Sequence, residues 1–147
     1  MRNADLVDIL IVEDNPNDAE LTIRALKKQN LIQQMYIAKD GEEALDFIFC
    51  RGDFTSRQHA RLPKVVFLDL KLPKINGLEV LKEIKSDPKT KSLPVVVVSS
   101  SKEDPDITQA YASGANGYVV KPVDFTAFIQ AISYAGLYWL TINETTV

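Results

Sequence analysis

The sequence predicts an α/β protein with a parallel five-stranded sheet, and two observations support that fold class. Five short apolar runs recur along the chain, and a helical pattern lies between each run and the next. The runs are Ile9–Val12, Met35–Ala38, Val65–Leu68, Val95–Val98 and Tyr118–Val120. The first, third and fourth runs are uninterrupted rather than alternating, which is typical of parallel strands covered on both faces.

The helical segments have recognisable start signals. Asn15-Pro16 joins a capping residue to a proline in the first turn, a common way to begin a helix. The further helical segments are Glu42–Phe49, Gly77–Lys85, one that begins at Asp104-Pro105 and one capped by Asp124. Because strand and helix alternate five times, we expect helices on both faces of the sheet, joined by right-handed crossovers. A single mixed sheet is the alternative.

Chain length and strand number favour the flavodoxin-like strand order 2-1-3-4-5, in which ligands bind beyond the carboxyl ends of strands one and three. The 147 residues predict a single domain over residues 1–147. Only one helix and a short apolar extension over residues 134–147 follow the last strand. We therefore expect no effector domain.

Composition excludes several function classes. Hydrophobic residues make up 46% of the chain and charged residues 25%, which excludes disordered and fibrous proteins. The net charge of −3 and the lack of a basic run longer than Lys27-Lys28 argue against a nucleic-acid partner. A lone cysteine, Cys50, and a lone histidine, His59, exclude internal disulfides and a zinc cluster. No stretch approaches the roughly 20 apolar residues of a membrane span, so we expect a cytoplasmic protein without membrane contact.

Polar side chains follow four of the predicted strands. Glu13-Asp14 follows the first strand, Asp69 the third, Ser99 the fourth and Lys121 the fifth. Three carboxylates at one sheet edge repel one another, since two charges about 4 Å apart cost roughly 4 kcal/mol even at an effective dielectric of 20. A cation between them would relieve this repulsion. All-oxygen ligation favours Mg²⁺, or Mn²⁺, held by Glu13, Asp14 and Asp69.

This arrangement is suited to phosphoryl chemistry. Asp69 ends a buried strand and can act as a nucleophile that forms an aspartyl phosphate. The metal would neutralise one side of the transferring group, and the Lys121 ammonium and the Ser99 hydroxyl would neutralise the others. Taken singly, each of these residues has an ordinary role as a helix cap, a turn residue or a solvated side chain. Their joint order along the chain favours a site.

The chain resembles the receiver domains of two-component response regulators over nearly its whole length. The motifs that carry the resemblance are Glu13-Asp14, Phe67–Pro73 followed by Asn76-Gly77, Ser99, and Lys121-Pro122. The resemblance implies that Asp69 accepts a phosphoryl group from a phosphohistidine of a sensor histidine kinase. It also implies that Lys71 lends its backbone carbonyl to the metal. Such a protein is not an enzyme but a signalling phosphoacceptor that assists its own phosphorylation and dephosphorylation.

The resemblance also implies a conformational switch. Receivers carry a hydroxyl residue at the Ser99 position and an aromatic residue at the Tyr118 position, and both reorient when the phosphoryl group arrives. The hydroxyl moves to a phosphoryl oxygen and the ring fills the vacated space, so that a local charge event changes the population of two states. By the same resemblance, the Lys121-Pro122 peptide bond would be cis.

Other functions that use similar residues fit less well. A haloacid-dehalogenase-type phosphatase would have a second acid at the position of Lys71, and a flavodoxin would have a phosphate-binding loop in place of Glu13-Asp14-Asn15. The alternative that stays open is a receiver-like module that binds proteins without phosphorylation. The presence of the full acidic set and Lys121 argues against it.

The C-terminal segment has apolar side chains on more than one helical face. They are Tyr134, Leu137, Tyr138, Trp139 and Leu140. Since exposed apolar patches commonly mark interfaces, we predict a homodimer through this helix. The alternative is one extra turn packed on the chain's own core.

A second resemblance concerns the partner. Gly136–Leu140 and the segment that begins at Cys50-Arg51 resemble the small stand-alone regulators paired with phytochrome-type histidine kinases. The loop over residues 51–63 is longer than typical connections. Its arginines, Arg51, Arg57 and Arg61, could meet an acidic kinase surface, although a solvated loop is the alternative. We expect Cys50 to be buried on the second helix and His59 to lie in the solvated loop.

Overall fold

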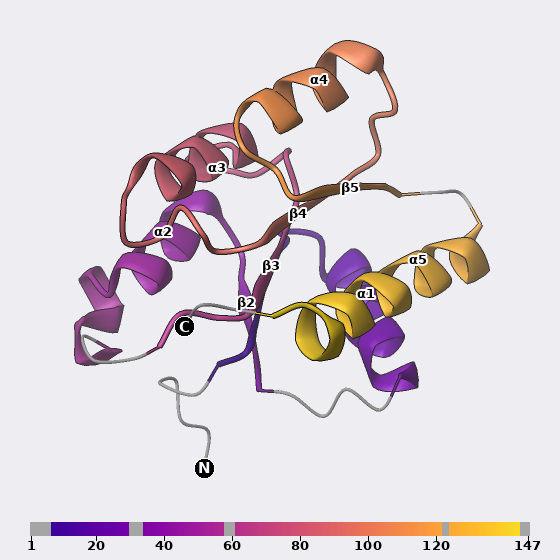
Figure 1. Ribbon diagram of the computed structural model, residues 1–147, viewed down its shortest axis with the longest axis horizontal. Helices are drawn as coiled ribbons and strands as arrows, with labels where there is room; N and C mark the ends of the chain where they lie inside the picture. Colours follow the sequence, from indigo (N-terminus) through magenta and orange to yellow (C-terminus); the bar gives the residue numbers. More distant parts are fainter. Residues whose placement is uncertain (1–6, 30–33, 58–60, 122–123, 145–147) are drawn as a thin grey trace.

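The computed structural model describes residues 7–29, 34–57, 61–121 and 124–144. Five parallel strands form one sheet in the order β2-β1-β3-β4-β5 (Figure 1). The strands are β1 Ile9–Val12, β2 Met35–Ala38, β3 Val65–Leu68, β4 Val95–Ser99 and β5 Gly117–Val120. The predicted fold class and strand order are confirmed, and the mixed-sheet alternative is excluded.

A helix follows each strand. The α-helices are α1 Pro16–Lys28, α2 Gly41–Phe49, α3 Gly77–Ser86, α4 Asp104–Ala112 and α5 Phe125–Leu137. A 3₁₀ segment, Gly52–Arg57, follows α2, and a π-helical turn, Tyr138–Ile142, continues α5. Four helices begin at a residue whose side chain accepts a backbone hydrogen bond from the first turn: Asn15, Asp40, Asn76 and Asp124. These caps satisfy N–H groups that the helices cannot pair internally.

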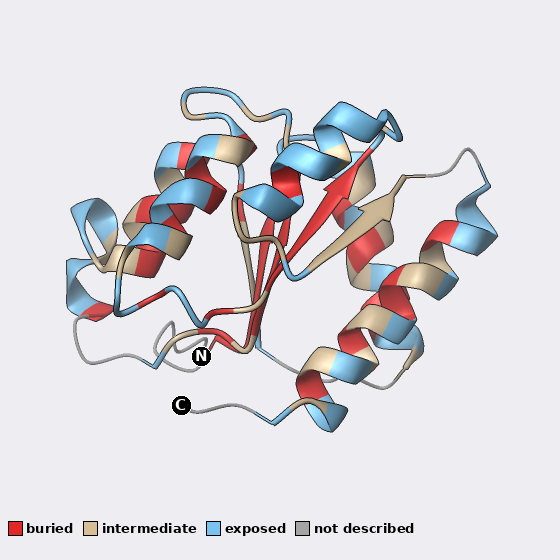
Figure 2. Cartoon of the chain, turned by 45° about the horizontal axis from the view of Figure 1, so that its top comes forward, coloured by how far each residue is buried: buried red, intermediate tan, exposed pale blue. Residues whose placement is uncertain are grey.

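Alternation along the strands divides the core into two layers. In β1, Leu10 and Val12 belong to the cluster that packs on α2, α3 and α4. Ile9 and Ile11 belong to the opposite cluster, which includes residues of α1 and α5. The buried strands run through the middle of the molecule between these helical layers (Figure 2). Both faces of the sheet are therefore covered, as the uninterrupted apolar runs predicted.

α5 packs beside α1, and Ser133 donates a hydrogen bond to the Ala25 carbonyl at 2.7 Å. Within the described residues, Phe125–Ile142 is one helical segment long and apolar enough to cross a membrane by length and composition alone. The expectation that no stretch approaches a membrane span is therefore too strict. The inner face of this segment is buried in the chain's own core, with Phe128 and Ile132 against the sheet. Burial within the chain accounts for only part of its apolar composition, since 28% of the segment is buried.

The five C-terminal residues predicted to form an interface differ in burial. Tyr134 and Tyr138 are exposed and Leu137 is half-buried, whereas Leu140 is buried in the cluster that includes α1 residues and Trp139 packs against that cluster. Leu140 is therefore unavailable to an interface at the surface, and for this residue the alternative of an extra turn packed on the chain's own core holds. It lies in a π-helical turn, in which the Asn143 amide donates to the Tyr138 carbonyl at 2.7 Å.

The segment after α2 also departs from expectation. Arg57 is 2% exposed, donates to the Phe47 carbonyl and stacks on the Phe47 ring at 3.6 Å from the centroid. Arg61 pairs with Asp8 at 2.5 Å. Arg57 is thus a buried structural residue and cannot meet a kinase surface. Cys50 is likewise not a buried residue within α2. It caps the helix in the left-handed conformation, with φ of 55°, and is half-buried.

Candidate functional site

Strand register brings the polar strand ends together. Val12 is paired with the last residue of β3, so Glu13 and Asp69 follow neighbouring strands at the same level. The Asp69 amide donates a hydrogen bond to the Val12 carbonyl at 3.0 Å. On the other side of β3, the Lys121 amide donates to the Ser99 carbonyl at 2.7 Å. Backbone pairing alone therefore delivers these side chains to one edge of the sheet.

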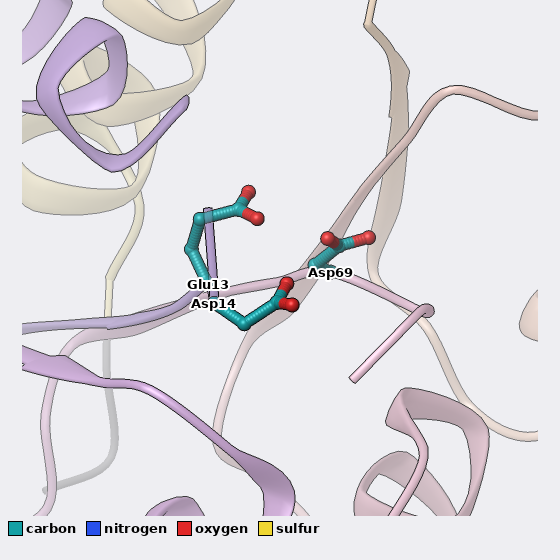
Figure 3. Close-up of side chains that lie close together, drawn as sticks. All are labelled: Glu13, Asp14 and Asp69. Carbon is teal, nitrogen blue, oxygen red and sulfur yellow. The ribbon is translucent and has the colours of Figure 1, made fainter. Parts of the chain in front are cut away.

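Three carboxylates meet at this edge. One oxygen each from Glu13, Asp14 and Asp69 lies within 4.8 Å of the others. Figure 3 shows the three side chains gathered where β1 and β3 end. Glu13 and Asp69 are buried, and Asp14 is exposed. The spacing and the all-oxygen donor set fit a hexacoordinate divalent cation such as Mg²⁺ or Mn²⁺, which would keep several waters on the exposed side.

Lys71 lies directly beside this cluster. Its amide donates a hydrogen bond to Asp69 Oδ1 at 3.2 Å. The Leu70-Lys71 peptide group is thus held against the Asp69 carboxylate. The role of the Lys71 carbonyl as a metal ligand stays a prediction.

Lys121 supplies the cation of the site. Its Nζ lies 2.8 Å from Glu13 Oε1, 2.9 Å from Asp18 Oδ2 and 3.3 Å from Asp69 Oδ2. Burial by itself would lower the pKa of this ammonium, but the hydrogen bonds to Glu13 and Asp18 outweigh burial and raise the pKa above its ordinary value. Lys121 therefore carries its charge at any physiological pH.

Glu13 is the carboxyl most affected by its surroundings. Burial raises its pKa to about 7; the hydrogen bond from Lys121 opposes this shift and the charge of Asp69 adds to it. This shift is mainly the cost of removing a carboxylate from water, to which the nearby charge of Asp69 adds. A divalent cation at the cluster would remove that cost.

Asp18 is the functional residue that the sequence prediction missed. It lies in the first turn of α1, three residues after the capping Asn15, where an acidic residue is ordinarily explained by the helix dipole. Asp14 precedes the capping Asn15, so the helical i,i+4 spacing does not connect it to Asp18. No periodic signal in the sequence points to Asp18, because its partner Lys121 lies 103 residues further along the chain.

Two glycines hold the loop that follows Asp69. A Cβ on Gly77 would lie 2.1 Å from the Asp69 carbonyl oxygen, and a Cβ on Gly41 would lie 1.9 Å from the Ile75 carbonyl oxygen. Gly77 also donates a hydrogen bond to the Leu70 carbonyl at 2.9 Å. The backbone of α2 and of α3 therefore approaches the loop more closely than any side chain would permit.

The predicted switch residues share a neighbour. Ser99 is 1% exposed, and its hydroxyl accepts a hydrogen bond from the Ser101 amide at 3.1 Å. The Tyr118 hydroxyl donates to the Ser101 carbonyl at 2.9 Å. Ser101 also donates through its own hydroxyl to Asp106 of α4. Ser99 and Lys71 line one open cavity of about 250 Å³ beside these groups.

Two predictions fall outside the part of the chain that the structure describes. They are the cis Lys121-Pro122 peptide bond, which involves residue 122, and the position of His59 in the loop.

A buried aspartate between an acidic cluster and a lysine, at the switch point of a doubly wound sheet, defines the class of signalling domains that accept a phosphoryl group on a carboxylate. The comparison with protein families agrees. The chain belongs to the response regulator receiver domain family, whose model matches residues 9–133.

Curated relatives extend over most of the chain. A probable methanogenesis regulatory protein, FilR2 of Methanothrix harundinacea, is 36% identical over 93% of this chain and 86% of its own length. The response regulator Rcp1 of Synechocystis sp. is 33% identical over 90% of this chain and 88% of its own length. The resemblance to small response regulators is confirmed.

Solved structures place the chain near phytochrome response regulators. The phosphorylated cyanobacterial phytochrome response regulator RcpA is 34% identical with a TM-score of 0.86, covering 95% of this chain and 97% of its own. The bacteriophytochrome response regulator AtBRR is 42% identical with a TM-score of 0.76, covering 97% of both chains. The Mn²⁺-bound form of Rcp1 is 31% identical with a TM-score of 0.86, covering 95% of this chain and 98% of its own.

Proposed function

We propose that Asp69 is the phosphoacceptor of this receiver domain and that its donor is the phosphohistidine of a sensor histidine kinase. The observation that carries the proposal is the Lys121 ammonium 3.3 Å from a buried Asp69 carboxylate that also belongs to an acidic cluster. An ordinary structural ion pair would not need Glu13 and Asp14 beside it.

The transfer requires little beyond positioning. An oxygen of the Asp69 carboxylate attacks phosphorus, the P–N bond of the phosphohistidine breaks, and the imidazole nitrogen leaves with the electron pair. Lys121 neutralises the phosphoryl oxygens from one side, and the Ser99 hydroxyl can donate to another. Glu13, Asp14, Asp69 and the Lys71 carbonyl would hold Mg²⁺ or Mn²⁺, which would supply the remaining neutralisation when bound.

The protein then acts as a phosphoacceptor and not as an enzyme, since the phosphorylated form is the signal. Ser99 and Tyr118 form the switch. Both side chains are hydrogen-bonded to Ser101, and the Ser101 hydroxyl is hydrogen-bonded to Asp106 of α4. A change at Asp69 can therefore reach the α4 surface through three hydrogen-bonded residues.

A phytochrome-type histidine kinase is the partner that the relatives support. RcpA and AtBRR are phytochrome and bacteriophytochrome response regulators by name, and the chain covers nearly all of each. We place this pathway in the cytoplasm, without contact with membrane or nucleic acid. The signal leaves through a protein surface, which we assign to a homodimer through α5 and the turn that continues it.

Acetyl phosphate tests the chemistry. With Mg²⁺ the protein should gain one phosphoryl group by mass, and Asp69→Asn should take up none. Lys121→Ala should still permit attachment but impair the switch. Uptake that persists in Asp69→Asn would identify a different acceptor.

Transfer from the kinase is tested separately. A phosphorylated phytochrome-type kinase should pass its label to the wild-type protein and not to Asp69→Asn. A faster transfer from an unrelated histidine kinase would overturn the assignment of the pathway and leave the phosphoacceptor in place.

A further inference from the structure

We propose that Asp18 is a positioning residue for phosphoryl transfer, which holds the Lys121 ammonium in register with Asp69. This inference rests on the proposed function. An ammonium has three donors, and Lys121 has three carboxylate partners, in Glu13, Asp18 and Asp69. Two short hydrogen bonds, at 2.8 and 2.9 Å, hold the nitrogen, while the longest, at 3.3 Å, reaches the phosphoacceptor.

Asp18 differs from the other two partners in its relation to the metal. Glu13 and Asp69 both belong to the cluster of carboxylates that could hold a divalent cation, and among the described residues Asp18 does not belong to it. A bound cation is the largest local charge and attracts the oxygens of its ligands. Asp18 is thus the partner whose bond to Lys121 does not compete with metal binding.

The start of α1 fixes the Asp18 carboxylate for this role. In a capping box, an acidic residue at this position would turn back to the N–H of the capping residue. Here Glu13 Oε2 accepts that hydrogen bond from the Asn15 amide at 3.3 Å. The Asp18 amide donates to Asn15 Oδ1 at 3.2 Å, and the Thr22 hydroxyl donates to the Asp18 carbonyl at 3.0 Å. The backbone of Asp18 is therefore fixed by hydrogen bonds, while its carboxylate stays available to accept from Lys121.

The geometry has a consequence for the reaction. Two N–H donors of the Lys121 ammonium are bound by Glu13 and Asp18, so the third is directed to Asp69 Oδ2. In the proposed reaction the phosphoryl oxygens lie beside this atom. Without Asp18, water can take one donor, because the Asp18 side chain borders solvent at 33% exposure. The ammonium is then less well oriented, and small misplacements of a reacting group have large effects on rate.

The test compares three variants with the wild type at saturating Mg²⁺ and acetyl phosphate. Asp18→Ala should lower the rate of phosphoryl uptake about tenfold, the change that one lost charge-assisted contact in the transition state produces. Asp18→Asn keeps an acceptor oxygen and should recover most of the rate. Glu20→Gln removes the same charge from an exposed position on α1 and should react like the wild type.

A second readout separates positioning from a general loss of structure. In ¹⁵N NMR, the Lys121 ammonium protons should exchange with water faster in Asp18→Ala than in the wild type, while the unfolding midpoint and the Mg²⁺ dissociation constant stay close to wild-type values. An Asp18→Ala protein that takes up phosphoryl groups as fast as the wild type, or faster, overturns the inference. A wild-type protein that takes up none refutes the proposed function, and the inference with it.

Discussion

At the scale of single residues, the site is a balance of charge. Glu13, Asp18 and Asp69 contact the Lys121 ammonium, and Asp14 adds a further carboxylate to the cluster formed with Glu13 and Asp69. The acidic excess makes the metal-free site unfavourable, and the cost is visible at Glu13, whose pKa burial and the neighbouring Asp69 charge both raise. The same excess creates affinity for a divalent cation and, through it, for a phosphoryl group.

The raised pKa of Glu13 predicts a pH dependence of stability. The folded metal-free protein keeps this proton up to a pKa of about 7, whereas the unfolded chain loses it near the ordinary carboxyl pKa of 4.5. This contribution to the free energy of unfolding is therefore complete below pH 4.5 and is lost as the pH rises to about 7. Denaturation with a chelator at a series of pH values measures it.

Glu13→Gln is the matched control for this prediction, since it should flatten the dependence between those pH values. Mg²⁺ should flatten it as well, because the cation replaces the proton as the partner of the carboxylate. A wild-type profile identical to that of Glu13→Gln would show that Glu13 ionises normally.

At the scale of elements, the loop between β3 and α3 connects the phosphoacceptor to the fold. Gly77 packs on the Asp69 carbonyl and Gly41 on the Ile75 carbonyl, so the loop is enclosed by the first turns of two helices. Because both contacts involve backbone, neither can relax by a side-chain rotation. The position of Asp69 thus depends on how α2 and α3 begin.

Gly77→Ala tests this dependence. The added Cβ would lie 2.1 Å from the Asp69 carbonyl oxygen, so the end of β3 must move. We expect a loss of about 1–3 kcal/mol in unfolding free energy, as for overpacked sites, together with slower phosphoryl uptake. Gly117→Ala is the control, since its Cβ would meet Val96 methyl groups at an ordinary 3.7 Å. Equal stability of the two variants would contradict the prediction.

Much of the fold and of the site could be predicted at this scale. Strand ends were readable because uninterrupted apolar runs stop abruptly at Glu13, Asp69 and Lys121, and parallel pairing brings such ends together. Asp18 could not be found by that rule, because it lies on a helix and its partner is more than a hundred residues away. Tertiary proximity of this kind leaves no periodic signal.

The errors have physical causes of their own. Arg57 was expected in a solvated loop, yet its guanidinium stacks on Phe47 and donates to that residue's carbonyl. Charge alone suggested exposure, although a planar guanidinium can be buried when an aromatic face and an acceptor receive it. Leu140 is buried against the chain's own core, a position that apolar residues on several helical faces could not distinguish from an interface.

At the scale of the whole molecule, the two helical layers have different surfaces. From Phe125 to Asn143 the chain carries no charged side chain. Among the residues on this segment, Tyr134, Tyr138 and Ile142 are large apolar groups with much of their surface exposed. Such a surface is unusual for a monomer and supports the proposed homodimer.

Oligomeric state tests that surface. Tyr138→Glu places a charge in the proposed interface and should shift the protein from dimer to monomer in sedimentation experiments at micromolar concentration. Lys82→Gln is the control. It changes the net charge by the same amount, at an exposed position of α3 on the opposite face of the sheet, and should leave the dimer intact. A wild-type protein that is monomeric under these conditions would exclude the dimer.

The hydrogen bonds around Ser101 have a consequence for how the two states of the molecule are related. The Ser99 hydroxyl and the Tyr118 hydroxyl both end on the peptide groups of this one residue. In the proposed switch Ser99 turns away, so the Ser101 amide would lose its acceptor, and the carbonyl that accepts from Tyr118 would be free to shift with it. The serine and the tyrosine are therefore mechanically linked, and intermediate arrangements with only one of them turned should be scarce.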